Sequence, residues 1–393
     1  MGRLELSGRN HVIRLGLIGL GAAGQAFLPA IAAHEGVTLA ATCDAREGAA
    51  EGIAGLEGVP SFTDPADMLA GVTLDAVYVG TPTDLHEDHV TAALDAGLHV
   101  LCEKPMAPGV EDCLALAAKA EAAGLALIVG HSHSHDLPIR RMREIILSGD
   151  LGAPAILSNT CYSDWVYRPR RPEELRPELG GGVTFRQGAH QFDILSALAC
   201  APAVSLRATT YDLDPERPTI GAHNVTIRFA NGATGTAIYN GYGWFDSSEL
   251  TGGVAEWGTA KEPAAPKRPA AAASPEEELR RKQERARTAI ADRAPHQPHF
   301  GLTLASCERG FLRQSPQGLM LHSAAGRQEI VLPLDRSPRM QVLDEFCDAI
   351  AGRPVLHTGA HGAAMTEICE AVLRSAAENR EIELLHQGPG NGD

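Results

Sequence analysis

Apolar and polar positions alternate in blocks over the first third of the chain. Short apolar runs at 12–18, 37–43, 74–79, 99–102 and 126–129 are separated by alanine-rich, helix-forming segments at 22–34, 46–55, 65–69, 85–96 and 110–123. Strands that alternate with helices in this way indicate a parallel sheet with crossover helices. We therefore expect an α/β domain over residues 1–130, with ligands bound beyond the carboxyl ends of its strands.

The pattern changes after residue 130. Strand-like runs at 155–161, 204–211, 224–229, 234–239, 319–322 and 329–332 are joined by helical segments at 138–147, 187–199, 341–351 and 360–378. Asn231-Gly232, between two of the runs, is a strong hairpin signal. Residues 131–393 are expected to form an α+β domain on an open, mostly antiparallel sheet, whose uncovered face favours a homodimer or homotetramer.

A low-complexity insertion at 258–298 interrupts this second pattern. It begins with an alanine- and proline-rich stretch, 263–275, and continues with a charged run, 276–293. This composition favours a mobile linker that carries one solvated helix. The alternative is a lid over a substrate cleft or an arm that reaches a neighbouring subunit.

The overall charge narrows the class of partner. With 34 Lys and Arg against 49 Asp and Glu, the chain has a formal net charge of -15, which argues against nucleic acid or an anionic membrane. The eight cysteines are scattered without a C-x-x-C pair, so we expect reduced thiols in a cytoplasmic protein and no cysteine-bound metal. We expect neither an apolar leader nor a membrane-spanning run.

The strongest chemical signal follows the first apolar run. Gly19, Gly21 and Gly24 form a G-x-G-x-x-G turn, with Ala22 and Ala23 inside it, just before a helical segment. A tight turn, close backbone approach and a helix N-terminus are what the pyrophosphate of a dinucleotide needs. We therefore predict dinucleotide binding at this turn.

Asp44 ends the next apolar run, about 20 residues beyond the last glycine, where a carboxylate can accept both hydroxyls of an adenosine ribose. The same charge repels a ribose 2′-phosphate, so the expected cofactor is NAD. NADP stays possible because Arg46, two residues on, can pair with a phosphate.

Lys104 is the first catalytic candidate. It stands in Cys102-Glu-Lys-Pro105, directly after a predicted strand and on the cofactor's side of the sheet. A lysine beside a nicotinamide can hydrogen-bond a substrate hydroxyl and, if burial or a neighbouring cation lowers its pKa, help to remove the proton. Glu103 is placed to orient it. The alternative is a surface lysine before a turn.

Several motifs together resemble the Gfo/Idh/MocA family of NAD(P)-dependent oxidoreductases. They are the glycine turn, Thr81-Pro82 with His86, Glu103-Lys104-Pro105, and Gly180-Gly-Gly-Val183 leading to His190 and Asp193. The resemblance spans both domains. It implies a Rossmann domain and an open-sheet substrate domain, with Lys104 and His190 meeting the substrate. It also implies that the cofactor is lined by Thr81, Pro82, His86, Glu103 and Lys104, and that Asp193 lies on the substrate side.

The sequence departs from the sugar-oxidising members of that family at Arg186, where they usually carry an aspartate four residues before the histidine. On a helix, Arg186 and His190 would share a face. A cation there disfavours protonation of His190 and of Lys104, and its planar fork suits a carboxylate.

A cationic and aromatic stretch precedes this position, in a chain that is otherwise acidic. Its candidate substrate-binding residues are Trp165, Tyr167, Arg168 and Arg170. They suit a flat, anionic substrate. The alternative is a set of solvated arginines paired with Glu173 and Glu174.

These departures resemble a narrower branch, the cis-dihydrodiol dehydrogenases of phthalate and chlorobenzoate breakdown. The run Gly-Gly-Gly-Val-Thr-Phe-Arg-Gln-Gly-Ala-His190 and Pro298-His-Phe-Gly301 carry that likeness. It implies hydride transfer from a ring carbinol of a dihydroxycyclohexadiene carboxylate to NAD, followed by enolisation to a catechol. A sugar, sugar-acid or cyclitol dehydrogenase is the alternative enzyme, and a non-catalytic NAD(H)-binding sensor is a second alternative.

Three histidines, His131, His133 and His135, follow the last strand of the first domain. On an extended backbone their rings would lie on one side, where they could bind zinc. Hydride transfer to NAD needs no Lewis acid when Lys104 and His190 are available, so we expect no metal. We assign His131 and His133 to substrate binding.

Overall fold

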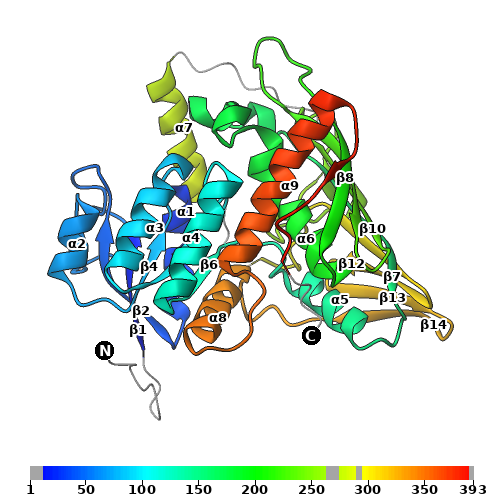
Figure 1. Cartoon of the computed structure of the whole chain (residues 1–393), viewed down its shortest axis with the longest axis horizontal. Coiled ribbons are helices and arrows are strands. Elements are labelled where there is room, and N and C mark those ends of the chain that lie inside the picture. Colours follow the sequence, from blue (N-terminus) through cyan, green and yellow to red (C-terminus); the bar gives the residue numbers. More distant parts are fainter. Residues whose placement is uncertain (1–11, 263–273, 289–293, 389–393) are drawn as a thin grey trace. The chain divides into compact units, whose positions relative to one another are not determined.

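The computed structural model describes residues 12–262, 274–288 and 294–388, shown in Figure 1. Their contacts divide the chain into two units. The first unit contains Met1–Ala107, Glu111–Gly130 and Arg339–Gly362, and the second contains Pro108–Val110, His131–Pro338 and Ala363–Asp393. The first unit thus includes a segment from late in the chain, Arg339–Gly362, in addition to residues up to Gly130.

The first unit is built on a parallel sheet of six strands in the order β3-β2-β1-β4-β5-β6. Its elements are β1 (Ile13–Ile18), α1 (Ala22–Ala33), β2 (Val37–Cys43), β3 (Ser61–Phe62), α2 (Pro65–Gly71), β4 (Ala76–Val79), η1 (Thr83–Leu85), α3 (His86–Asp95), β5 (His99–Cys102), α4 (Val110–Ala123), β6 (Leu127–Val129) and α8 (Pro338–Ile350). Strand order reverses between β1 and β4, which is where sheets of this kind bind ligands.

The strands of the first sheet are largely buried because helices pack against the sheet. Phe27 of α1 and Phe346 of α8 share one apolar cluster with Leu15 and Tyr78. One predicted helix, 46–55, is wrong. These residues form successive turns, since Gly48, Gly52 and Gly55 adopt φ of 69°, 70° and 86°, which an α-helix cannot accommodate.

The second unit is built on a sheet of nine strands in the order β14-β13-β12-β11-β7-β10-β9-β8-β15, of which only β7 and β10 pair in parallel. Its strands are β7 (Pro154–Tyr162), β8 (Ala203–Tyr211), β9 (Ala222–Phe229), β10 (Thr234–Asn240), β11 (Leu302–Cys307), β12 (Gly310–Ser315), β13 (Gly318–Ser323), β14 (Gly326–Val331) and β15 (Ile382–Glu383). The predicted α+β class and mostly antiparallel sheet are confirmed. Strands β11, β12 and β15 were not predicted.

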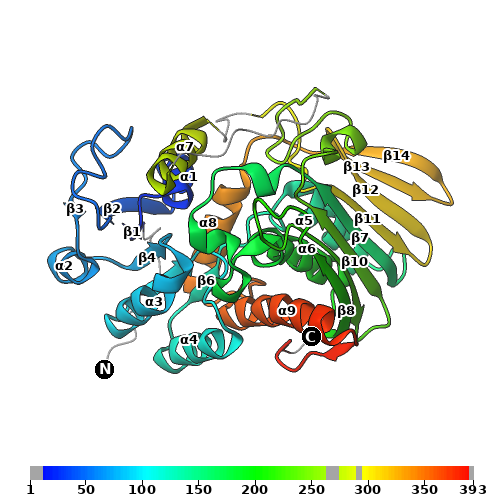
Figure 2. The ribbon, with the colours of Figure 1, turned by 90° about the horizontal axis from the view of Figure 1, so that it is seen from above.

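Helices of this unit are α5 (Leu137–Leu147), α6 (Ala189–Ala199), α7 (Pro275–Thr288) and α9 (Gly359–Glu378), with short turns η2 (Trp165–Tyr167), η3 (Pro172–Leu175), η4 (Pro177–Leu179), η5 (Thr184–Gly188) and η6 (Ser247–Leu250). Figure 2 shows α5 and α6 along one side of the sheet. Among the described residues, no helix combines the length and apolar character that a bilayer crossing requires.

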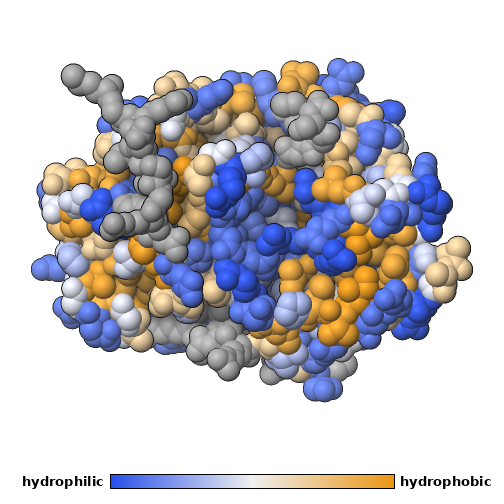
Figure 3. All heavy atoms as spheres, turned by 90° about the horizontal axis from the view of Figure 1, so that it is seen from below, coloured by the Kyte–Doolittle hydropathy of each residue, from blue (hydrophilic) through white to orange (hydrophobic). Residues whose placement is uncertain are grey.

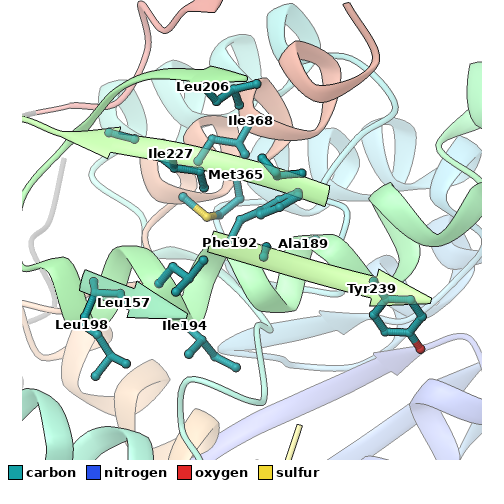
Figure 4. Packing of buried hydrophobic residues seen from close by; sticks show 14 of the residues in the cluster. Leu157, Ala189, Phe192, Ile194, Leu198, Leu206, Ile227, Tyr239, Met365 and Ile368 are labelled. Carbon is teal, nitrogen blue, oxygen red and sulfur yellow. The ribbon is translucent and has the colours of Figure 1, made fainter. Parts of the chain in front are cut away.

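The core of the second unit lies between α6 and the sheet. Figure 4 shows Phe192 and Ile194 of α6 beside Leu157 of β7 and Ile227 of β9, all buried. The predicted hairpin at Asn231-Gly232 is confirmed, because β9 and β10 pair antiparallel around it and Gly232 adopts a φ of 87°. The sheet thereby presents one packed face to α6 and leaves the other open.

The open face alternates threonines with apolar side chains. In register across the sheet, Ile238 lies beside Thr160 and Thr160 beside Leu302, while Ile156 is 61% exposed. Figure 3 shows that apolar residues on the face it displays gather in patches between polar ones.

Candidate functional site

The turn after β1 has the geometry of a pyrophosphate cradle. Gly19 has a φ of 100°, and a Cβ on Gly24 would lie 1.9 Å from the carbonyl oxygen of Gly19. A Cβ on Gly21 would meet no atom within 4 Å, so the side of the turn that a ligand would occupy is open. Gly21 is also the N-cap of α1 and brings no side chain to that end of the helix. The residues present therefore fit a dinucleotide.

Asp44 at the end of β2 is held next to this turn. Its Oδ2 accepts from the backbone N–H of Leu20 at 2.9 Å, and its Oδ1 accepts from Nε of Arg46 at 2.8 Å. Burial alone would raise the pKa of Asp44, but the hydrogen bonds from Arg46 and Leu20 lower it. The carboxylate is therefore ionised, and Arg46 is paired with it in this structure.

The loops after β4 and β5 are tied together by His86. Its Nδ1 lies 2.9 Å from the carbonyl oxygen of Pro105, and its Nε2 lies 2.9 Å from that of Thr81. The two ring nitrogens of His86 thus contact backbone carbonyls of both loops, and this fixes the loop that carries Lys104.

Glu103 and Lys104 follow β5 as predicted. The hydroxyl of Tyr78 donates to Oε1 of Glu103 at 2.9 Å, and the backbone N–H of Lys104 donates to Oε2 at 3.2 Å. Burial and the charge of Glu103 raise the pKa of Tyr78. Tyr78 is buried in β4 and was not predicted as a site residue, because it reads as an ordinary strand residue. Lys104 itself is half-buried.

In the second unit, His131, His133 and His190 lie close together. The ring of His133 is centred 4.8 Å from that of His190, and the ring of His131 is 6.4 Å from His190. Phe300 completes the group at 5.1 Å from His190 and 4.4 Å from His133. His190 begins α6, directly after the π-helical turn η5.

The backbone of residues 131–135 is not extended throughout, so the condition for three rings on one side is not met. A turn begins at His133, with the N–H of Asp136 donating to its carbonyl oxygen at 3.2 Å. Among the described residues, no group of three metal-ligating side chains combines His131, His133 and His135.

His133 belongs to a chain of alternating charges that is buried at His133 and Asp136 and half-buried beyond them. Its Nδ1 lies 3.2 Å from Asp136 and its Nε2 lies 3.4 Å from Glu256, whose other oxygen lies 3.7 Å from Arg168. Arg168 also donates to Asp164 at 2.7 Å. Burial alone would lower the pKa of His133, but Asp136 and Glu256 outweigh it and raise the pKa to about 9. His133 is therefore protonated at neutral pH.

Arg186 lies one helical turn before His190 and pairs with a buried acid. Its Nη2 donates to Oε1 of Glu174 at 3.1 Å, and Lys282 of α7 pairs with Oε2 of the same carboxylate. Arg171 pairs with Glu173 at 3.1 Å. Within the stretch itself, the pairing that the alternative names is present at Arg171, whereas the pair of Arg186 with Glu174 is largely buried.

The remaining predicted residues have varied surroundings. Trp165 is fully buried, with the guanidinium carbon of Arg170 4.3 Å from its ring centroid. Tyr167 donates its hydroxyl to Asp214 at 2.8 Å, and Asp193 is fully buried in α6. Pro82 is the N-cap of η1. Lys104 and His190 belong to different units, so a shared substrate between them stays a prediction.

Some neighbours of the site were missed in the sequence. Glu256 and Trp257 lie just before the low-complexity insertion, and Trp257 stacks 4.7 Å from His133. Lys282 lies within the insertion, where a charged run predicts a solvated helix. No local spacing connects these residues to the histidines; the only signal was the likeness carried by Pro298-His-Phe-Gly301, which contains Phe300.

Two family models match the chain. Residues 13–131 match an oxidoreductase family with an NAD-binding Rossmann fold, and residues 139–250 match the GFO/IDH/MocA C-terminal domain. One match falls in the first unit and the other in the N-terminal part of the second.

Individual proteins agree with the models. The chain is 34% identical over 374 residues to 1-carboxy-3-chloro-3,4-dihydroxycyclo hexa-1,5-diene dehydrogenase of Comamonas testosteroni, covering 92% of this chain and 94% of that protein. Inositol 2-dehydrogenase 3 of Saccharopolyspora erythraea is 35% identical over 186 residues, 47% of this chain and 52% of its own. A crystal structure of a protein from Bordetella bronchiseptica RB50, assigned as a dehydrogenase, is 35% identical with a TM-score of 0.85 and covers 95% of this chain and 100% of its own.

The cradle, the fold and these matches define an NAD-binding dehydrogenase. The chain belongs to the Gfo/Idh/MocA family of oxidoreductases, and its cofactor is NAD, bound by the Rossmann unit.

Proposed function

We propose that this dehydrogenase oxidises a ring carbinol of a carboxylated cis-dihydroxycyclohexadiene, giving a catechol. The observation that carries the proposal is the relative from Comamonas testosteroni, whose name specifies such a substrate and whose likeness spans 92% of this chain. The positive charges of Arg168, Arg170, Arg186 and Lys282 near the start of α6 support an anionic substrate.

The first unit would hold the cofactor at the residues already described. The open cradle at Gly21 and the N-terminus of α1 suit the pyrophosphate, and Asp44 suits the adenosine ribose. Thr81, Pro82, His86 and Glu103 would line the nicotinamide half. When bound, NAD supplies the hydride acceptor for the carbinol carbon.

His190 is the better candidate for the base. Its ring lies 4.8 Å from that of His133, which is protonated at neutral pH, so a second positive charge on His190 is disfavoured. A neutral His190 can take the hydroxyl proton as the C–H hydride leaves. Lys104 would donate a hydrogen bond to the same oxygen. Its backbone is held by Glu103 and by the contacts of His86 with Thr81 and Pro105.

The reaction balances without another reactant. The carbinol loses a hydride from carbon and a proton from oxygen, and becomes a ketone. Loss of the proton on the adjacent carbinol carbon and protonation of the ketone oxygen convert this ketone to the catechol. Recovery of aromaticity favours the forward direction.

A substrate comparison tests the proposal. We expect NADH formation from a carboxylated cis-dihydrodiol with kcat/KM at least about 30-fold above that for inositol or an aldose, since one well-placed charged contact contributes about 2 kcal/mol or more. Faster turnover of inositol would instead support a cyclitol dehydrogenase, the function named for the Saccharopolyspora erythraea relative.

The open face of the second sheet supports a homodimer or homotetramer. Ile156, Ile238 and Leu302 place apolar surface on that face among threonines. Light scattering of the wild type and of Ile156→Lys gives the test: the wild type is expected as an oligomer and the variant as a smaller species.

A further inference from the structure

Three cations act on one buried carboxylate in η3, while a fourth, Arg171, lies 3.9 Å from this carboxylate and pairs more closely with Glu173. Glu174 is 3% exposed and pairs with Arg186 and with Lys282, and the charge of Arg170 acts on it as well. Burial alone would raise the pKa of Glu174, but these cations hold it well below its usual range. One carboxylate cannot neutralise three cations, so the cluster carries an excess of positive charge.

Arg170 supplies the uncompensated charge. Among the described residues, no carboxylate pairs with its guanidinium, and its buried Nε–H has no acceptor. The buried Nε1–H of Trp165 also has no acceptor there, although the Arg170 guanidinium stacks 4.3 Å from the Trp165 ring. Burial lowers the pKa of Arg170 to about 10, so it stays charged at neutral pH. Two adjacent buried donors and a fixed cation suit an anionic oxygen ligand.

Helix α7 brings the third cation to this place. Glu278 accepts from Arg217 at 2.6 Å and from the backbone N–H of Arg170 at 2.8 Å. Lys282, four residues on, lies on the same face and reaches Glu174. The helix is thus attached to the backbone of Arg170 by a hydrogen bond and to Arg217 and Glu174 by ion pairs, and is more than the solvated helix that its composition predicts.

We propose that Arg170 and Lys282 form the carboxylate-binding subsite of this dehydrogenase, with Trp165, Glu174 and Glu278 as the scaffold that holds them. The subsite rests on the proposed function, since it assumes an anionic ring substrate. It makes the low-complexity insertion a part of substrate recognition, because α7 supplies one of the two ligating cations.

Matched substrates test the subsite. Steady-state kinetics are measured with a carboxylated cis-dihydrodiol and with the cis-dihydrodiol that lacks the carboxylate, for the wild type, Arg170→Met and Lys282→Met. We expect KM for the carboxylate to rise about 10- to 100-fold in each variant, as for loss of a charge-assisted hydrogen bond. The kinetics of the uncharged diol are expected to stay within about twofold of wild type.

Controls separate recognition from folding. Arg280→Met removes a cation of α7 that pairs within its own helix, with Glu277 and Glu284, and is expected to change neither substrate. Arg170→Lys is expected to recover part of the lost affinity. If Arg170→Met is unstable, Lys282→Met provides the test of the subsite. The Lys282 side chain is 21% exposed, so its replacement should disturb the fold less.

Each outcome has a separate meaning. Equal losses with both diols, or none with the carboxylate, would overturn the subsite while leaving the dehydrogenase activity in place. Turnover of neither diol by the wild type would overturn the proposed function instead.

Discussion

The phosphate turn and the charge cluster around Glu174 recognise negative charge in different ways. At the turn, backbone geometry does the work: Gly19, Gly21 and Gly24 open a cradle at a helix N-terminus. Around Glu174, side chains from segments up to 108 residues apart hold one another through ion pairs. Substitutions in the turn should therefore act through steric exclusion, whereas those in the cluster should act through charge and depend on pH.

The largest expected effect separates chemistry from cofactor binding. Replacing His190 or Lys104 by Ala is expected to lower kcat by about 10²- to 10⁴-fold, the usual contribution of a positioned acid or base. Both variants should still bind NAD, measured by NADH fluorescence, because the pyrophosphate cradle lies elsewhere; a small loss is expected only for Lys104→Ala, whose side chain would line the cofactor. Retained turnover in both variants would contradict the roles assigned to His190 and Lys104.

The next largest effect tests the phosphate turn, where backbone geometry makes room for the cofactor. Gly24→Ala places a Cβ 1.9 Å from the carbonyl oxygen of Gly19, so we expect lower thermal stability and NAD affinity reduced by more than about 100-fold. Gly21→Ala meets no atom of the protein within 4 Å and should weaken NAD binding while leaving the melting temperature unchanged. Tight NAD binding by Gly21→Ala would show that the cradle does not face the cofactor.

The phosphate turn and the charge cluster around Glu174 also differ in how much of each could be predicted from the sequence. The strand, turn, helix and acid around Gly19–Gly24 are consecutive in the chain, and the structure has them close to the predicted bounds. The hairpin at Asn231-Gly232 was predicted for the same reason. Local sequence specifies such features because the interacting groups are neighbours.

Features that depend on distant segments were predicted less well. Glu256 and Lys282 contact the site from within or beside the insertion, and no periodicity connects them to His133 or Glu174. Residues 339–362 lie with the first unit although they follow the second in sequence. Local composition can also mislead, as the helix predicted at 46–55 shows. Its helix-forming residues are outweighed by glycines with positive φ, which form turns instead.

A pH titration distinguishes two buried histidines of the second unit. The pKa of His133 is raised to about 9, so its protonated form stabilises the fold fully below pH 6.5 and less as pH rises toward 9. Burial lowers the pKa of His223 to about 3, so its contribution is present above pH 6.5 and is lost as pH falls.

Urea unfolding at pH 6.5 and pH 8 measures the His133 contribution. We expect the wild type to lose up to about 2 kcal/mol across this interval relative to His133→Gln, which lacks the titrating group. His223→Gln should still lose free energy of unfolding between pH 6.5 and pH 8, as the wild type does, and should differ from the wild type only below pH 6.5. Parallel curves for the wild type and His133→Gln would mean that His133 is neutral in the fold, and would remove the argument for a neutral His190.

The smallest expected effect lies at Asp44, where the two modes of recognition meet. Its carboxylate accepts from the backbone of Leu20 and from the side chain of Arg46, so it is fixed by the turn and is charged. Asp44→Asn keeps an acceptor but removes the charge, and we expect NAD affinity to fall about 10-fold, because a charge-assisted hydrogen bond is roughly twice as strong as a neutral one. Without repulsion of a 2′-phosphate, and with Arg46 released, NADP should bind more tightly than to the wild type. If Asp44→Asn lowers the affinity for NAD and for NADP equally, Asp44 only stabilises the turn and does not contact the ribose. Recognition of the cofactor at the turn would then depend on backbone geometry alone.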